Sequence, residues 1–114
     1  MPISPALLML SAHLLAPVSE RVPSLNVEPS CRAAAAIGLA GSQSYDGCMK
    51  DETTAREQLL ASWQTFPMPD RARCSTEAST DGIASYVDLL VCLQMSRDAA
   101  AAQGIQLKGA RRKN

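Results

Sequence analysis

Four cysteines in a chain of 114 residues constrain the possible fold more than any other feature. Cys31, Cys48, Cys74 and Cys92 are separated by 16, 25 and 17 residues. Zinc sites favour pairs of ligands about two to four residues apart, and a redox dithiol favours C-x-x-C; the sequence has neither spacing. Because the count is even and the N-terminus resembles an export signal, we predict two disulfides rather than four buried thiols.

The length allows one domain, and the first thirty or so residues look separable from the rest. The part that folds would then contain only about 75 to 90 residues, a size at which a hydrophobic core alone gives slim stability. A disulfide closing a loop of this size contributes about 3 kcal/mol in the chain-entropy model. Two such bonds would supply a large share of the stability of the domain.

A first helix is predicted to begin at Pro29, which fits a first turn because its missing N–H costs nothing there. The residues that share one face of this helix are all small, so another backbone can come close to it, as a disulfide requires. These residues are Cys31, Ala34, Ala35 and Gly38. Gly41 is expected to end the helix, and Asp46 to cap the next one.

The second predicted helix has the clearest pattern, a single stripe in steps of three and four that runs for about five turns. The stripe consists of Cys48, Glu52, Ala55, Leu59, Trp63 and Phe66. Glu52 is expected to form an i, i+4 ion pair with Arg56 on the surface. Pro67 and Pro69 are expected to stop the helix.

A short third helix is predicted over 70–79, with Cys74 and Ala78 on one side. Its apolar face is too thin to hold it by packing alone. The turn at 80–82 follows, and Ser85 with Asp88 then resembles a capping box.

The fourth helix is predicted to extend to Gly104 and to be apolar on two sides. Its main stripe would face the second helix and consists of Tyr86, Leu89, Leu90 and Leu93. Val91, Cys92 and Met95 would face the third helix. A helix that is apolar on both sides is usually the central one of its bundle.

The predicted helices rank the three possible disulfide connectivities. Cys48 begins a helix nearly 30 Å long, and Cys74 lies just past its far end, so a bond between them would require the short third helix to reach too far back. Cys74 and Cys92 lie at similar distances from the turn between their helices. We therefore favour Cys31 with Cys48 and Cys74 with Cys92, and the nested pairing of Cys31 with Cys92 and Cys48 with Cys74 is the alternative.

The apolar run at 6–16 has the length of the hydrophobic region of a secretion signal and is too short to span a bilayer. It lacks preceding Lys or Arg residues, contains His13, and has no clear cleavage motif after it. We predict export to the periplasm or beyond, with a cytosolic chain as the alternative. Residues 1–28 would then be signal segment and linker, 29–104 the domain, and 105–114 a loose basic tail.

The formal net charge is zero, so no overall field attracts the chain to nucleic acid or to an anionic membrane. A basic cluster closes the chain: Lys108, Arg111, Arg112 and Lys113. We interpret it as a solvated tail rather than a polyanion-binding site. We predict no nucleic-acid partner and no stable membrane span.

No catalytic, metal-binding or cofactor motif occurs in the sequence. The only histidine, His13, lies in the segment predicted to be removed, and neither G-x-S-x-G nor S-x-x-K is present. Asp51, Glu52 and Asp88 are interpreted as exposed helical acids. Trp63 and Phe66 could form the floor of a ligand site, but their spacing on the stripe of Leu59 favours a place in the core. We predict no catalytic, cofactor or metal residues.

Several motifs resemble those of a family of small, uncharacterised exported proteins of alphaproteobacteria, rhizobial types especially. They are C-x-x-D-E-x-x-A-R-E-Q-L at 48–59, W-x-x-F at 63–66, R-x-R-C at 71–74 and S-Y-V-D-L-L-x-C-L-x-M at 85–95. The resemblance covers about residues 31–98. It implies an envelope location and a four-cysteine helical core, and it implies no catalytic residue.

Together these observations predict an all-α fold, a small four-helix array cross-linked by two disulfides. The predicted core consists of Leu59, Trp63, Phe66, Tyr86, Leu89, Leu90 and Leu93. The predicted function is that of a non-catalytic interaction or structural module outside the cytoplasm, with a protein partner possible. A protein with a small apolar ligand pocket between the second and fourth helices is the first alternative, and an enzyme is the second.

Overall fold

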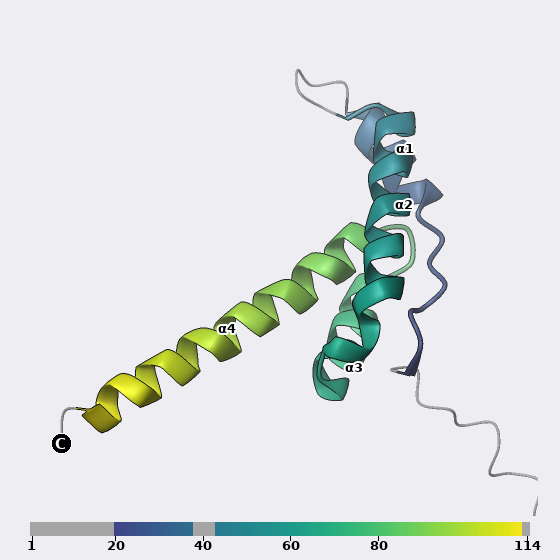
Figure 1. Ribbon diagram of the computed structural model, residues 1–114. Helices are drawn as coiled ribbons and strands as arrows, with labels where there is room; N and C mark the ends of the chain where they lie inside the picture. The colour runs from purple at the N-terminus through teal and green to yellow at the C-terminus, as the bar shows by residue number, and fades with distance from the viewer. Residues whose placement is uncertain (1–19, 38–42, 113–114) are drawn as a thin grey trace, which may run out of the picture.

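The computed structural model describes residues 20–37 and 43–112, with side chains up to residue 104. The described part contains four α-helices and a short 3-10 helix, and no β-strand. The elements are α1 (Glu28–Ala36), α2 (Tyr45–Ser62), η3 (Trp63–Thr65), α3 (Met68–Ala78) and α4 (Tyr86–Arg112). The all-α prediction is therefore confirmed (Figure 1). The predicted signal region up to residue 19, His13, Gly38 and Gly41 lie outside the described residues.

The starts of α1 and α2 follow from their first residues. Pro29 occupies the first turn of α1, as predicted. The N-cap of α2 is Ser44 and not Asp46, because the extended backbone of Ser44 lets its Oγ accept a hydrogen bond from the Gly47 N–H at 3.1 Å. Asp46 lies in the first turn of α2 instead, where its charge favours the positive end of the helix dipole.

The predicted stripe of α2 is buried along its whole length, from Cys48 to Phe66. At its end the helix tightens into η3, and the Phe66 N–H donates to the Trp63 carbonyl at 3.2 Å. Phe66 itself has extended backbone, as expected for a residue that precedes Pro67. α3 begins at Met68, two residues earlier than predicted, with Pro69 in its first turn.

The first half of α4 packs against both α2 and α3, so its predicted central position is confirmed. Tyr86, Leu89 and Leu93 are buried, and Leu90 is half-buried against the same core. The prediction that Val91 and Met95 face α3 is wrong, because their side chains are 45% and 66% exposed. Each lies about 160° around the helix from Leu93, and the short α3 covers only the flank that carries Cys92.

The fourth helix does not end at Gly104 but continues to Arg112. The C-terminal half of α4 extends away from the other helices (Figure 1). Gly104 does not adopt a positive φ; among the described glycines only Gly82, in the turn before α4, does so, at 82°. An interior glycine costs a helix only about 1 kcal/mol. Four consecutive alanines at 99–102 precede it and carry the helix through this position.

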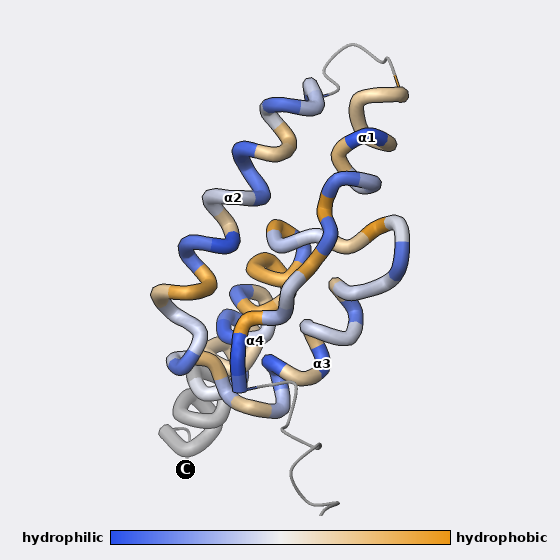
Figure 2. Tube along the Cα trace, turned by 90° about the vertical axis from the view of Figure 1, so that its right-hand side faces the viewer, coloured by the Kyte–Doolittle hydropathy of each residue, from blue (hydrophilic) through white to orange (hydrophobic). Residues whose placement is uncertain are grey.

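Residues 20–27, predicted as a linker, pack on the helices and extend the domain toward the N-terminus. Val27 is buried, and Val22 and Leu25 contact the core. Hydrophobic and hydrophilic positions follow one another along this segment (Figure 2). The Tyr86 hydroxyl donates to the Pro23 carbonyl at 3.0 Å and accepts from the Leu25 N–H at 2.8 Å. Pro23 disfavours a helix here, but an extended segment can still place several of its side chains against the core.

Candidate functional site

The four cysteines form the two disulfides that the helix geometry favoured. Cys31 is bonded to Cys48 across α1 and α2, with their Cα atoms 5.4 Å apart. Cys74 is bonded to Cys92 across α3 and α4, with their Cα atoms 5.7 Å apart. Cys31, Cys48 and Cys74 are buried, whereas Cys92 is partly exposed. Each bond thus ties a short helix to a long one.

Glu52 has a role that differs from the one predicted from the sequence. It is buried, and its carboxylate accepts hydrogen bonds from the Ser85 hydroxyl at 2.6 Å and from the Tyr86 N–H at 2.6 Å. The Val87 N–H lies 3.4 Å from the same carboxylate. Unpaired N–H groups and the positive end of the dipole at a helix start both favour a negative charge. Glu52 of α2 therefore caps α4 from a neighbouring helix.

This contact corrects two predictions about acidic residues. Glu52 is not an exposed helical acid, and its carboxylate binds the start of α4 rather than Arg56. Because Glu52 lies on the apolar stripe of α2, the sequence pattern already indicated that its side chain is buried. Ser85, the predicted cap of α4, accepts from the Asp88 N–H at 3.2 Å. The Ser85 N–H, to which the Asp88 carboxylate was expected to bind, donates instead to the Ala78 carbonyl at 3.2 Å.

A cavity of 340 Å³ lies between α1, α2 and the start of α4, close to the buried disulfide. Its lining includes Asp51, Glu52 and Asp88. Asp51 accepts a hydrogen bond from the Gln43 amide, and Glu52 is occupied by the cap. Three of its lining residues are acidic, whereas pockets for small apolar ligands are lined mainly by hydrophobic side chains. Among the described residues, the lining contains no histidine, lysine or arginine. Within 20–37 and 43–104, no cluster of His, Cys, Asp or Glu could hold a metal ion.

Trp63 and Phe66 belong to the core, as predicted, and each is covered by an arginine. The Arg71 guanidinium lies 5.8 Å from the centre of the Trp63 ring, and that of Arg97 lies 4.1 Å from the centre of the Phe66 ring. Both rings are buried. The cation–π contacts close this end of the core and leave neither ring as the floor of a ligand site.

The clearest exposed apolar side chains on α4 form what we call the outer face: Val91, Met95 and Ala102. They follow one another in steps of four and seven, so they share one side of the helix, opposite Leu93. No element of the described part of the chain covers them. An exposed apolar stripe on a convex helix can contact another protein more readily than it can enclose a small molecule.

Comparisons of the chain with protein-family models, with curated proteins and with solved structures find no match. The resemblance to small exported alphaproteobacterial proteins stays a prediction from the sequence motifs. Among the described helices, none combines the length and the apolar character that crossing a membrane requires.

Proposed function

We propose that this protein is exported and acts without catalysis, as a cross-linked helical module that binds another protein through the outer face of α4. The observation that carries the proposal is the exposure of Val91 and Met95 on a helix that is otherwise anchored by a buried stripe. Exposed leucines or methionines scattered singly need no explanation, but these two lie one turn apart on one face.

Export is supported by the chemistry of the cysteines and by the apolar run at 6–16. Disulfides persist in oxidising compartments such as the periplasm and are rare where glutathione keeps thiols reduced. All four cysteines of this chain are bonded in two pairs. A domain of this size gains a large share of its stability from such bonds, and it keeps that stability only where the bonds stay oxidised.

A binding role is supported by the buried Glu52 carboxylate and by the arginines over Trp63 and Phe66, because these groups contact other parts of the domain. The one buried carboxylate of α2 is saturated by the start of α4, and the large aromatic rings are covered. Glu52, Arg71 and Arg97 therefore serve the fold. The outer face and the half of α4 that extends from the body are both available to a partner (Figure 1).

Site-specific photo-crosslinking in the native host tests the binding proposal. A photoreactive amino acid at position 95 lies on the outer face, and one at position 57 lies on an exposed part of α2 and serves as the matched control. We expect one adduct of discrete mass from position 95 and none from position 57. A Val91→Asp substitution on the same face should abolish the adduct, because it places a charge in an apolar contact.

Two results would contradict the proposal. Adducts of equal yield from both positions would mean that contact with the outer face is not selective, and no adduct from position 95 would mean that nothing binds there. Export is tested separately by fractionation of the same cells: recovery of the chain in the cytosol with four alkylatable thiols would overturn that part.

A further inference from the structure

The two disulfides differ in how far a reagent in solution can reach them. Cys31 and Cys48 are both buried between α1 and α2. In the other bond Cys74 is fully buried, but Cys92 is partly exposed on α4. Because thiol–disulfide exchange requires a thiolate to reach one of the sulfurs, the partial exposure of Cys92 makes this bond more accessible than the first one.

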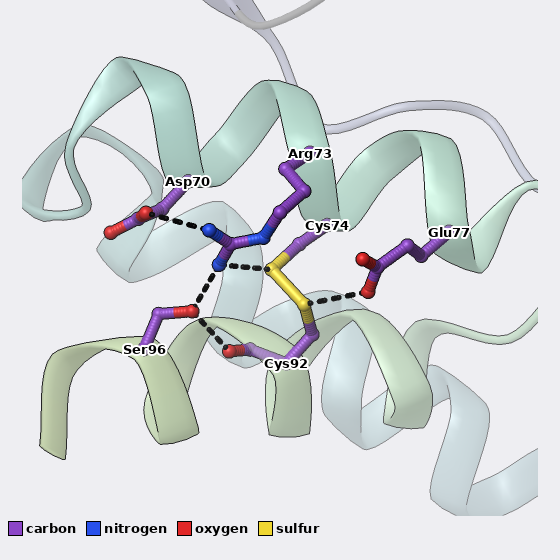
Figure 3. Close-up of polar contacts among 6 residues, drawn as sticks. All are labelled: Asp70, Arg73, Cys74, Glu77, Cys92 and Ser96. Carbon is purple, nitrogen blue, oxygen red and sulfur yellow. Dashed lines mark hydrogen bonds and ion pairs between the residues drawn. A yellow bond between two sulfur atoms is a disulfide. The ribbon is translucent and has the colours of Figure 1, made fainter. Parts of the chain in front are cut away.

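Charged groups surround the Cys74–Cys92 bond asymmetrically (Figure 3). Nη2 of Arg73 lies 3.8 Å from the Cys74 sulfur. This guanidinium is held in place by an ion pair with Asp70 at 3.5 Å and by donation of a hydrogen bond to the Ser96 hydroxyl. Ser96 in turn donates to the Cys92 carbonyl at 3.0 Å, so the arginine is tied to both helices.

The other sulfur has a negative neighbour. Oε2 of Glu77 lies 3.4 Å from the Cys92 sulfur (Figure 3). A sulfur in a disulfide carries no hydrogen, so this contact is not a hydrogen bond while the bond is intact. One sulfur is therefore next to a cation and the other next to an anion.

From this arrangement we infer that Cys74–Cys92 is a site of thiol–disulfide exchange with a fixed direction, in which Cys92 is attacked and Cys74 leaves. The thiolate of an incoming dithiol forms a bond to the Cys92 sulfur, the Cys74–Cys92 bond breaks, and its electron pair goes to Cys74 as a thiolate beside Arg73. The second thiol of the dithiol loses its proton to water and attacks the dithiol's own sulfur in the mixed disulfide, which releases Cys92 as a thiolate. The protein gains two electrons and the dithiol becomes a cyclic disulfide.

The neighbouring charges act on the rate of this exchange in opposite ways. A cation beside Cys74 stabilises its thiolate, and a more stable leaving group leaves faster. The Glu77 carboxylate repels an approaching thiolate at Cys92 and slows the same step. Arg73 thus favours Cys74 as the leaving group, while Glu77 slows the attack on Cys92. Neither effect depends on the partner proposed for the outer face.

Breaking this bond affects α3 most. Its buried apolar residues are only Cys74 and Ala78, so the disulfide is its principal link to α4. Without the bond, the packing that remains is polar or small, and α3 can move away from the flank of α4. Reduction would therefore open one side of the domain while the buried Cys31–Cys48 bond keeps α1 on α2.

The order of reduction tests the site in the full chain. Limited treatment with dithiothreitol, an acid quench, alkylation under denaturing conditions and peptide mapping give a rate for each bond. We expect Cys74–Cys92 to be reduced at least about tenfold faster than Cys31–Cys48, because Cys92 is partly exposed whereas Cys31 and Cys48 are buried. Equal rates, or faster reduction of Cys31–Cys48, would overturn the proposal.

A monothiol tests the direction. With glutathione as the probe, the mixed disulfide should form on Cys92 while Cys74 is recovered as the thiol. Glutathione found mainly on Cys74 would overturn the proposed direction even if this bond is the first to open.

Two variants separate the proposed electrostatic effect from loosening of the fold. Arg73→Gln should slow the exchange about threefold, because it removes the cation beside the leaving thiolate, and Glu77→Gln should speed it by a similar factor. Glu57→Gln, which removes an exposed charge from α2, is the control and should leave the rate unchanged. If both test variants speed the exchange, local loosening is the cause and the proposal fails; it also fails if neither changes the rate.

Discussion

α4 contacts α2 and α3 by two different means. Its contact with α2 and the adjoining η3 is a core of buried apolar side chains that includes Leu59, Trp63, Leu89 and Leu93, together with the cap from Glu52. Its contact with α3 buries little apolar surface and contains a disulfide instead. A helix that can bury large apolar side chains is held against its neighbour by the hydrophobic effect. A helix that cannot do so needs a covalent link to its neighbour.

The difference explains why the domain needs both kinds of contact. The hydrophobic contact of α2 with α4 does not depend on the redox state, whereas the contact of α3 with α4 does. The two interfaces should therefore fail under different treatments: substitution of a large buried side chain should weaken the first, and loss of a cysteine pair the second.

The largest effect is expected from Trp63→Ala, which removes the largest side chain from the α2–α4 core. Trp63 is buried, and truncation of a buried tryptophan typically costs about 3 to 5 kcal/mol of unfolding free energy. Urea unfolding monitored by circular dichroism measures the loss. A loss under about 1 kcal/mol would show that Trp63 does not contribute to the core as the structure indicates.

The next largest effect is expected from removal of the Cys74–Cys92 bond by a double substitution to alanine. The bond closes a loop with a sequence separation of 18 residues, for which the chain-entropy model gives about 3 kcal/mol. Hydrogen exchange should show that the loss of protection is greatest in α3. Equal loss of protection in α2 would mean that the two interfaces are not independent.

A smaller effect is expected from Glu52→Gln, which tests the polar part of the α2–α4 contact. The amide keeps an acceptor but loses the charge that favours the start of α4, and hydrogen bonds to charged groups contribute about 1.5 to 3 kcal/mol. We expect a loss of about 1 to 2 kcal/mol in unfolding free energy. Ser85→Ala, which removes the local cap of the same helix, is the matched comparison and should cost about 1 kcal/mol.

The sequence was sufficient to predict several features that depend on periodicity and on helix length. The buried stripe of α2, the central place of α4 and the pairing of Cys31 with Cys48 and of Cys74 with Cys92 are all confirmed. Each follows from helical spacing and from helix length, which are local properties. Leu90 is the one predicted core residue that is only half-buried, because it lies at the edge of its stripe.

What could not be predicted depends on contacts between distant segments. Glu52 and the start of α4 are more than thirty residues apart in sequence, and nothing local shows that a carboxylate on an apolar stripe will cap another helix. Residues 20–27 have no helical periodicity, so the sequence could not predict their hydrogen bonds to the Tyr86 hydroxyl. The exposure of Val91 and Met95 depends on how little of α4 the short α3 covers.

The smallest effect is expected from deletion of residues 105–114, which leaves both interfaces intact. Residues 98–103 of α4 are exposed, so the helix has already left the core before the deleted part begins. Extending an existing helix adds little free energy per residue, because one hydrogen bond is gained for each residue that is ordered. We expect Tm to fall by no more than about 2 °C, while circular dichroism reports fewer helical residues. A fall of many degrees, or a Tm of the full chain that rises with protein concentration, would mean that this half of α4 packs against something, and the comparison would then need a third interface.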